Sequence, residues 1–422
     1  MENDGSGHSR NHSHSHDSDG HPQDHPRTGW LQHRHSHNHD SPLDEGPSRR
    51  DFLRVLTGGV LAGASILELA WHRAAWARSA APSGESTLFD IQRVADGVFF
   101  AHARAQAMVN CNAAIFVRSK DVVVVDAHSK PSAAASLIAQ IQREVTLRPV
   151  RYVVNTHFHF DHMQGNHAYR LTGNKVDFIA SATTRQLMQD LAIVRMKESL
   201  NQVPKLTDAL RERASRSKSA AEKAFCADQI RQLEAYQAEL KDFTLELPTI
   251  SVDKSYALKD PAMDLHIDYH GHSHTSGDVF VFCPQQRAIA TGDAIHGYFP
   301  NIYDGFPRVW PGTIDSVGHA DFKYVLGGHG PAQSDRVVMT SLRNYIEELT
   351  EKVAEAKQAG QTVDEVQQRI TVASLESLQS NGYAQFLTRT SAEMIPHFGD
   401  MPPLQDSVNE NLRQVYANLD RV

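Results

Sequence analysis

Three histidines and one aspartate stand within six residues of the chain, in the stretch HFHFDH that begins at residue 157. The four are His157, His159, Asp161 and His162, and they directly follow the largely apolar run VRYVVNT. Buried polar groups cost free energy unless they are paired, so this cluster is a poor design for a core at the end of a buried strand. Imidazole nitrogens and carboxylate oxygens are ligands that zinc favours. The stretch therefore predicts a metal site.

Three later stretches carry metal-capable side chains in a similar setting. GHSHTSGD contains His274, TGD contains Asp293 and GGHG contains His329, and each of these loops follows a strand-like run. Their glycines permit tight turns, so the side chains can converge on one cleft at the ends of the strands.

The spacing within HFHFDH suits two metal ions. Residues two apart in an extended segment point the same way, so His157 and His159 can reach one ion. Asp161 and His162, in the turn that follows, can reach a second. Two ions that share a hydroxide lower its pKa and polarise a substrate carbonyl, so no serine or cysteine nucleophile is required. The predicted chemistry is hydroxide attack on a carbonyl, with the metals stabilising the tetrahedral oxyanion.

The elements that must position these loops alternate between strand and helix patterns. Runs rich in β-branched and aromatic residues predict strands over 97–103, 112–118, 121–127, 150–157, 175–181, 265–271, 278–284, 287–293 and 322–326. Pro131 opens a helical pattern over 131–145, and a charged helical stretch runs from about Thr183 to Leu240. We interpret this stretch as an inserted antiparallel helical pair that serves packing or forms a lid. The alternation predicts an α/β layered fold.

In order and approximate spacing, the metal motifs resemble those of the metallo-β-lactamase superfamily, over roughly residues 90–331. The resemblance implies an αββα sandwich that holds two Zn²⁺ ions. The ligands that it implies are, for the first ion, His157, His159 and His274, for the second ion, Asp161, His162 and His329, and, as a bridge between the ions, Asp293. Asp126, near the end of VVVVDA, resembles the family's aspartate that contacts a metal ligand without binding the metal itself.

At two positions the residue differs from that of particular subgroups of the family, and these differences narrow the expected activity. Asp293 stands where many zinc β-lactamases carry cysteine, which favours the broader set of lactonases, glyoxalase II-like thioesterases and related esterases. Diiron members generally have a carboxylate at the position of His159, so histidine there favours zinc. We therefore expect a zinc-dependent hydrolase of an ester, lactone, thioester or β-lactam, with Asp161 as a catalytic residue that, like a metal-bound water, can protonate the leaving group. The alternatives are hydrolysis of a phosphate or sulfate ester at the same site and a non-hydrolytic metal-binding or redox protein of the same fold.

Four segments are predicted along the chain. They are a disordered His-rich tail over 1–47, a signal peptide over 48–77, a metallo-β-lactamase-like domain over 85–335 with the helical insertion at 182–245, and a helical C-terminal extension over 336–422. The tail is either a solvated segment or an arm that collects metal.

The second segment resembles a twin-arginine export signal. Arg49 and Arg50 precede an apolar run from about Val55 to Leu67 and a small-residue cleavage site that would end at Ala77. The resemblance implies recognition by the twin-arginine export machinery, a periplasmic or secreted protein and no stable membrane span after processing. An uncleaved N-terminal anchor helix is the alternative.

Composition restricts the partners. The formal net charge is −8, and binding to nucleic acid depends on basic residues, so we expect a small-molecule substrate and no nucleic acid. The three cysteines are widely spaced, which favours free thiols in the core.

Several residues near the motifs have open roles. His270 and His272 compete with His274 as ligands, and His128, His167 and His296 are expected to be ordinary loop or capping residues. The aromatics that follow Asp293 either line a substrate pocket or pack in the core, and they are Tyr298, Phe299, Tyr303, Phe306 and Trp310.

Overall fold

The structure, a computed structural model, describes residues 88–421 apart from 105–109, 242, 395–397 and 400–401. The predicted His-rich tail and the twin-arginine signal lie outside these residues, as does the cleavage site at Ala77. Among the described residues, none of the helices combines the length and apolar character needed to cross a bilayer.

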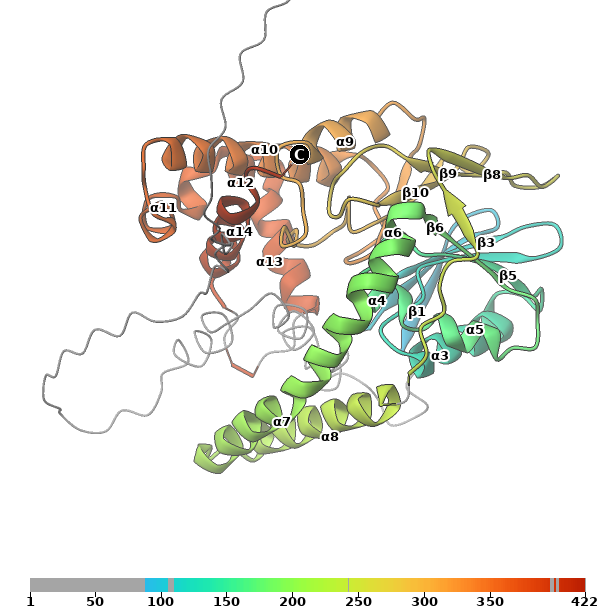
Figure 1. Ribbon diagram of the computed structural model, residues 1–422, viewed down its shortest axis with the longest axis horizontal. Helices are drawn as coiled ribbons and strands as arrows, with labels where there is room; N and C mark the ends of the chain where they lie inside the picture. The colour runs from blue at the N-terminus through green and yellow to red at the C-terminus, as the bar shows by residue number, and fades with distance from the viewer. Residues whose placement is uncertain (1–87, 105–109, 242, 395–397, 400–401, 422) are drawn as a thin grey trace, which may run out of the picture. The chain divides into compact units, whose positions relative to one another are not determined.

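The first sheet has seven strands in chain order (Figure 1). They are β1 (Phe89–Ala95), β2 (Val98–Ala103), β3 (Ala113–Val117), β4 (Val122–Val125), β5 (Val150–Val154), β6 (Asp177–Ser181) and β7 (Ile250–Val252). The strands from β1 to β4 are antiparallel hairpins, whereas β4 to β7 run parallel. Parallel pairing requires a crossover, which α3 (Pro131–Glu144) supplies between β4 and β5.

The second sheet has five strands in the order β12, β11, β10, β9, β8. They are β8 (Ser255–Leu258), β9 (Leu265–Tyr269), β10 (Val279–Cys283), β11 (Ala288–Gly292) and β12 (Tyr324–Gly327). All pairs are antiparallel except β11 and β12, which run parallel across the connection that contains α9 (Trp310–Val317).

Three hydrophobic clusters show how the layers pack. One joins the two sheets face to face, for example through Val125 and Val281. A second lies on the other face of the first sheet, against α3 and α5 (Asn166–Arg170). The third lies on the other face of the second sheet, against the C-terminal helices. This order of layers confirms the predicted αββα sandwich.

The stretch between β6 and β7 is helical, as predicted. It consists of α6 (Ala182–Leu187), one π-helical turn (Met188–Ala192), α7 (Ile193–Arg216) and α8 (Ala220–Leu240). The last two pack side by side as an antiparallel pair (green in Figure 1) around a cluster of their own that includes Leu210 and Leu233. Ser219 begins α8 by accepting a hydrogen bond from the backbone N–H of Glu222.

The C-terminal extension is also helical, as predicted. Its α-helices are α10 (Val337–Gln358), α11 (Val363–Arg369), α12 (Glu376–Gln379), α13 (Tyr383–Met394) and α14 (Leu404–Asn418), drawn in orange to red in Figure 1. Gly360, with φ +76°, ends α10 in the left-handed conformation that glycine favours.

Three strands escaped the sequence analysis, namely β1, β7 and β8. In β1 and β8 polar or charged residues alternate with apolar ones, and β7 has only three residues, so none forms the continuous apolar run that revealed the inner strands. Each of the three also lies at the edge of its sheet, where one side lacks a neighbour.

Candidate metal centre

The four predicted loops converge at one edge of the sandwich. HFHFDH follows β5 and runs into the short helix α4 (Phe160–Met163), while the other loops follow β9, β11 and β12. The structure brings together all seven predicted ligands, and each is buried, with at most 6% of its surface exposed. They are His157, His159, Asp161, His162, His274, Asp293 and His329.

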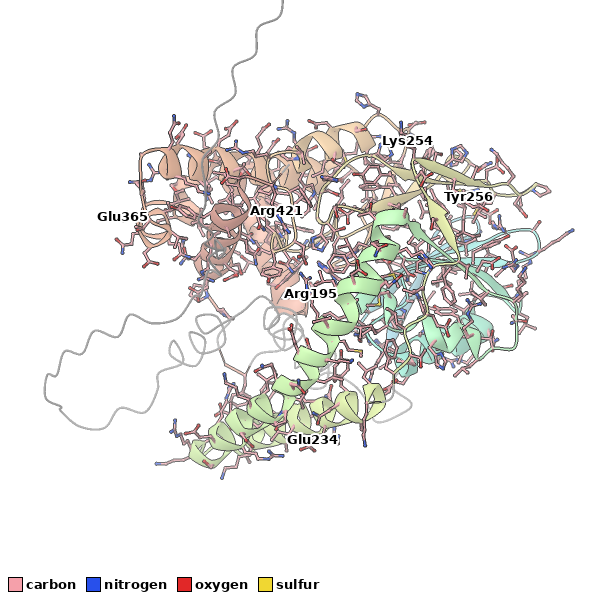
Figure 2. The ribbon with its side chains drawn as sticks, in the orientation of Figure 1. Arg195, Glu234, Lys254, Tyr256, Glu365 and Arg421 are labelled. Atoms are coloured by element: carbon pink, nitrogen blue, oxygen red, sulfur yellow. The ribbon has the colours of Figure 1, made fainter. Side chains whose placement is uncertain are left out.

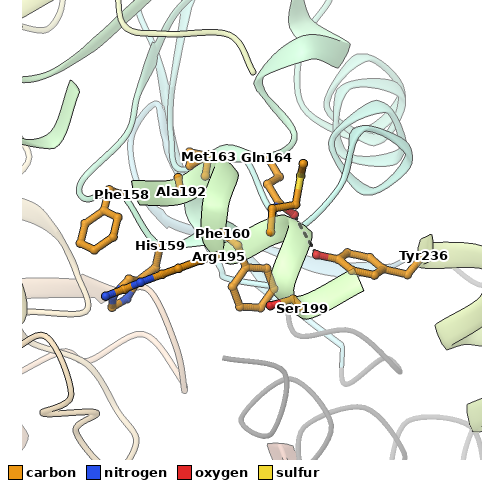
Figure 3. Close-up of a pocket in the computed structure, with 10 residues that line it drawn as sticks. Phe158, His159, Phe160, Met163, Gln164, Ala192, Arg195, Ser199 and Tyr236 are labelled. Carbon is orange, nitrogen blue, oxygen red and sulfur yellow. Dashed lines mark hydrogen bonds between the residues drawn. The ribbon is translucent and has the colours of Figure 1, made fainter. Parts of the chain in front are cut away.

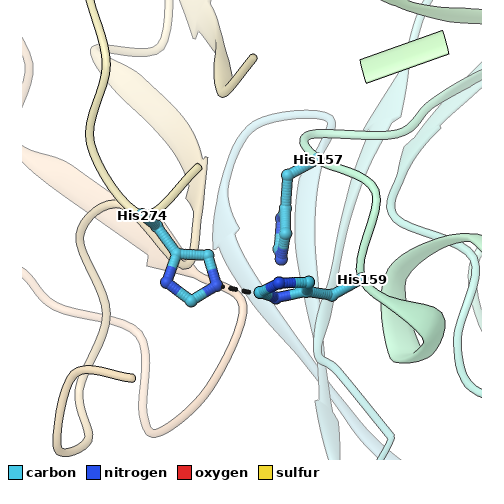
Figure 4. A group of neighbouring side chains, drawn as sticks. All are labelled: His157, His159 and His274. Atoms are coloured by element: carbon cyan, nitrogen blue, oxygen red, sulfur yellow. Dashed lines mark hydrogen bonds between the residues drawn. The ribbon is translucent and has the colours of Figure 1, made fainter. Parts of the chain in front are cut away.

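Three imidazoles form the first group (Figure 4). Ligand atoms of His157, His159 and His274 all lie within 4.8 Å of one another. Nε2 of His274 faces Nδ1 of His159 at 2.9 Å, and the ring of His157 meets the other two edge to face. Three convergent nitrogens are the usual protein ligand set of a catalytic zinc, which keeps one position for water.

Asp161, His162 and His329 form a second group, in which Nε2 of His329 lies 3.1 Å from a carboxylate oxygen of Asp161. Asp293 lies between the two groups. Its carboxylate is 3.3 Å from His329, 3.5 Å from His162 and 3.7 Å from His274. A carboxylate in this position can hold two ions at once.

The outer nitrogens of three histidines show which nitrogen faces the centre. Nδ1 of His274 donates to the Asn301 carbonyl at 2.9 Å, and Nδ1 of His162 donates to Asp126 at 2.8 Å. Nε2 of His159 donates to Asp304 at 2.8 Å. A carbonyl or carboxylate can only accept, so a neutral imidazole with its proton on the outer nitrogen presents a lone pair inward. This is the arrangement that second-layer partners impose on metal-binding histidines.

Asp126 also fixes the start of the motif. Its carboxylate accepts hydrogen bonds from the Thr156 backbone N–H at 2.8 Å and from the Thr156 hydroxyl. Because that hydroxyl donates to Asp126, its oxygen is left to accept from Nδ1 of His157, which lies 3.0 Å away. Asp126 holds this place with φ +70°, a strained conformation for a residue other than glycine.

The polar atoms at the centre fit a cation. Nε2 of His157, Nε2 of His162 and Oδ1 of Asp293 are buried and make no hydrogen bond with any residue that the structure describes. Buried polar atoms without a partner cost roughly 1–3 kcal/mol each, and two inward lone pairs at 2.9 Å repel unless positive charge lies between them. Metal ions bound by the two groups would satisfy these atoms.

The pKa shifts agree with this charge pattern. Burial and the neighbouring imidazoles hold the pKa of His157 well below its ordinary value, and burial and His159 do the same for His274. Burial alone would raise the pKa of Asp161, but His162 and His329 outweigh it and lower the value to about 2. His157 and His274 are therefore neutral and Asp161 is ionised, which are the protonation states that metal binding requires. Burial opposes protonation of His162, but the surrounding acidic groups outweigh it and raise its pKa well above the ordinary value, so His162 would release a proton on binding a metal.

Gly328 leaves room for the centre. A Cβ atom at this position would lie 2.3 Å from Oδ1 of Asp293 and 2.7 Å from Cε1 of His162. Any larger residue would displace these groups, so the GGHG loop needs glycine immediately before His329.

Asp304 and Arg195 were missed by the sequence analysis. The Asp304 carboxylate accepts two hydrogen bonds from Arg195 of α7, at 2.6 and 2.8 Å, besides the one from His159. Burial opposes ionisation of Asp304, but hydrogen bonds from Arg195 and His159 outweigh it and hold its pKa well below the ordinary value. No local motif marks either residue, because they lie 109 positions apart.

A small cavity lies beside His159, between α4 and the inserted helices (Figure 3). Its volume is about 10 Å³, roughly the space of one water molecule. The Tyr236 hydroxyl donates to Oε1 of Gln164 beside it, while Nε2 of Gln164 is buried and finds no hydrogen-bond partner in the described part of the chain. Its lining residues are Phe158, His159, Phe160, Met163, Gln164, Ala192, Arg195, Met196, Ser199 and Tyr236.

The predicted aromatics divide between core and loop. Tyr298, Phe299 and Trp310 belong to the cluster under the C-terminal helices, so they pack in the core. Tyr303 and Phe306 are partly exposed. The guanidinium of Arg195 lies 5.5 Å from the ring of Tyr303, which places that ring beside Asp304 rather than in the core.

The remaining predicted residues lie outside the seven-ligand cluster. His270 faces the Ser316 hydroxyl, His272 packs against Phe306 and His167 pairs with Glu246. His128 is fully buried and its Nδ1 donates to the Cys111 carbonyl, whereas His296 is buried against the rings of Tyr298 and His329.

The cysteines are free and buried, as predicted. Cys111 comes close to Asp126 and His162. Burial raises its pKa to about 12, so it is a neutral thiol at neutral pH rather than a thiolate ligand.

Comparison with solved structures finds similar chains at low sequence identity. The chain is similar to a metallo-β-lactamase from Pontibacter korlensis, with 16% identity, a TM-score of 0.43 and coverage of 60% of this chain and 97% of that one. It is similar to the metallo-β-lactamase FIM-1 from Pseudomonas aeruginosa in its mono-zinc form, with 17% identity, a TM-score of 0.44 and coverage of 63% and 98%.

A third similar structure is the stereoselective inverting sec-alkylsulfatase Pisa1 from a Pseudomonas species. Its identity is 16% and its TM-score 0.50, and the match covers 78% of this chain and 50% of that one. The sequence profile of the metallo-β-lactamase superfamily matches residues 108–349, more than half of the chain. This span contains all seven residues that converge in the centre, and the chain belongs to the metallo-β-lactamase superfamily.

Proposed function

We propose that the protein is a hydrolase that depends on two zinc ions. The observation that carries the proposal is the pair of ligand groups that meet at Asp293, with inward-facing atoms that find no hydrogen-bond partner among the described residues. The superfamily consists mostly of hydrolases. Five histidines with two carboxylates suit zinc, since imidazole and carboxylate are among its favoured ligands.

The residues divide the work between holding and orienting. His157, His159 and His274 would hold one ion, Asp161, His162 and His329 the other, and Asp293 both. Bound zinc would supply a water of lowered pKa and a Lewis acid for the substrate oxygen. Asp126 and Asp304 keep His162 and His159 turned inward, so the chain fixes the geometry before a substrate arrives.

Asp161 can also move a proton. Its pKa of about 2 means that it is ionised at neutral pH, so it begins as a proton acceptor. It would take the proton of the attacking water and then pass it to the leaving group, which fits general base and acid roles in turn. The burial of Asp161 beside His329 keeps bulk water from competing for this proton.

We place the scissile bond in an ester, lactone, thioester or β-lactam carbonyl. A sulfate or phosphate ester at the same centre is the other outcome that an experiment must separate. The test is hydrolysis by the purified, zinc-loaded protein of a chromogenic cephalosporin, an acyl lactone, a glutathione thioester, an aryl ester and a sulfate ester, together with counting of bound metal.

The matched variants are Asp161→Ala and His270→Ala. The first removes a proposed ligand, and turnover should fall more than about 100-fold. Loss of a residue that only hydrogen-bonds to a metal ligand typically costs about 10- to 100-fold. The second removes a histidine that bonds Ser316 outside the cluster, so activity should persist. Bound iron with visible absorbance would refute the zinc hydrolase, and one tightly held ion without turnover would point to a structural role.

Export belongs to the same proposal. Arg49 and Arg50 before an apolar run and a small-residue site support processing after Ala77 and release of a mature chain outside the cytoplasm. Mass measurement of the protein from the periplasmic fraction should find Arg78 as the first residue, and Arg49→Lys with Arg50→Lys should keep the precursor inside the cell.

A further inference from the structure

Residues 300–304 form a loop without regular secondary structure between β11 and α9. Two of the three imidazoles in the first group are oriented by this loop. The Asn301 carbonyl accepts from His274 at 2.9 Å, and the Asp304 carboxylate accepts from His159 at 2.8 Å. The positions of these two acceptors therefore decide where the inward nitrogens of both ligands point.

A loop of this kind needs outside partners, because its backbone groups have no ladder or helix to satisfy them. The partners come from α14. Gln414 accepts from the Ile302 N–H at 2.7 Å, and Asn411 donates to the Pro300 carbonyl at 2.7 Å. Asn418 donates to the carbonyls of Ile302 and Tyr303, at 2.6 and 2.7 Å.

The three amides share one face of α14, at spacings of three and four residues. Other contacts fix two of them. Oδ1 of Asn411 accepts from the Tyr345 hydroxyl at 3.0 Å, and Nε2 of Gln414 donates to Glu410 at 3.1 Å. Asn411 and Gln414 are buried, so they hold the loop from inside the protein rather than from its surface.

Asp304, at the C-terminal end of the loop, is bound by the inserted helix α7 and not by α14. Arg195 of α7 binds both oxygens of Asp304, and its guanidinium lies over the rings of Phe158 and Tyr303 at 5.3 and 5.5 Å. Figure 2 labels Arg195 and also Arg421, which follows α14 and donates to the Tyr303 carbonyl at 3.4 Å. The loop is thus fixed between the insertion and the C-terminal helix.

We propose that α14 is a positioning element of the metal centre, in which Asn411, Gln414 and Asn418 hold the loop that orients His159 and His274. The inference rests on the proposed zinc centre but goes beyond it, because α14 lies outside residues 108–349 that the superfamily profile matches. These three are positioning residues and touch neither ion nor substrate.

The test compares two variants of the same helix. Asn418→Ala removes both bonds to the loop at a half-buried position, so the protein should still fold. Gln405→Ala is the matched control, because Gln405 also lies on α14 and bonds backbone atoms of another segment, the N–H of Val372 and the carbonyl of Ile370. Asn418→Asp is a second variant that places a carboxylate against two carbonyl oxygens.

The measurements are Zn²⁺ affinity by chelator competition and the visible spectrum of the Co²⁺-substituted full chain, beside thermal unfolding. We expect Asn418→Ala to weaken the tighter-bound zinc about 3- to 10-fold, less than loss of a direct partner of a ligand, and to shift the Co²⁺ bands. Asn418→Asp should do so more strongly, while Gln405→Ala matches wild type in both readouts.

Equal affinities and spectra for Asn418→Ala, Gln405→Ala and wild type would overturn the positioning role. Failure of the wild-type protein to bind zinc or Co²⁺ would instead overturn the proposed centre, and the inference with it. The two failures are therefore distinguished by the wild-type titration.

Discussion

The inserted helices and the C-terminal helices both bind the loop of residues 300–304 beside the metal centre, but they are built into the molecule differently. The α7–α8 pair packs around its own cluster, in which Leu233 is central, and reaches Asp304 through Arg195. The C-terminal helices share one continuous cluster with the second sheet, in which Leu412 and Ile289 both take part. They reach the same loop through several neutral amides.

The two regions therefore differ in how closely their unfolding is coupled to unfolding of the sheets. An element with a separate core can open locally without disturbing the sheets, whereas one that shares the core of the sheet should unfold together with it. The inserted helices are therefore suited to move relative to the metal centre. The C-terminal helices are suited to keep the loop of residues 300–304 in a fixed position.

The largest effect is expected where the two regions meet. Asp304→Ala removes the carboxylate that pairs with the Arg195 guanidinium, whose side chain is only 12% exposed, and breaking a largely buried ion pair in this way costs up to about 3–5 kcal/mol in the free energy of unfolding. It also removes the acceptor for His159, so zinc affinity should fall about 10- to 100-fold. Chemical denaturation and chelator competition measure the two losses.

The control for this variant is Asp315→Ala, which removes an exposed partner of Arg343. Its cost should stay within about 1 kcal/mol, with zinc affinity unchanged. An Asp304→Ala protein as stable as this control would show that the insertion does not depend on this carboxylate.

Truncation of a core side chain in each region should affect the hydrogen-exchange protection of the second sheet differently. Leu412→Ala and Leu233→Ala each remove a side chain that is at most 1% exposed, and such changes cost about 2–5 kcal/mol. Leu412→Ala should lower hydrogen-exchange protection in the second sheet, because the two share a core. Leu233→Ala should lower protection only in α7 and α8. Equal loss of protection in the sheet for both variants would remove the distinction drawn between the regions.

Mild acid should act on the sandwich rather than on either helical region. Burial lowers the pKa of His128 to about 3, whereas in the unfolded chain it is near 6.5. Below pH 6.5 the unfolded chain therefore binds a proton that the folded chain does not, and stability falls as the pH falls towards 3. At pH 5 this residue alone contributes a loss of about 2 kcal/mol.

The check is the pH dependence of unfolding for metal-free wild type and His128→Asn. Asparagine tolerates the positive φ of +72° at this position, so the variant should fold. Its stability should change less between pH 7 and pH 5 than that of wild type. Parallel curves would show that His128 does not titrate as inferred.

The smallest effect is expected at the surface of the insertion. Arg211 of α7 and Glu234 of α8, the latter labelled in Figure 2, pair at 2.8 Å with 52% of each side chain exposed. Arg211→Ala should change the free energy of unfolding by less than about 1 kcal/mol, and 1 M salt should erase the difference. A larger, salt-resistant loss would mean that the insertion depends on its surface charges more than on its core.

Much of the layered fold could be read from the sequence. Most inner strands are largely apolar runs, and the loops that carry Asp293 and His329 follow directly after such runs. His274 follows β9, in which polar and apolar residues alternate, as expected of a strand with one face in the core. The edge strands β1, β7 and β8 could not be read in this way, because a half-covered strand shows no continuous apolar run.

By itself the sequence determined the ligand types, their order and the strands after which they stand, because these depend on local spacing and on the chemistry of imidazole and carboxylate. Only the tertiary structure decided which groups orient them. Asp304 lies 145 residues from His159, and Asn418 lies 116 residues from the Ile302 carbonyl that it holds. Such pairings depend on which buried donor meets which acceptor once the helices and sheets have packed, and no local pattern encodes that.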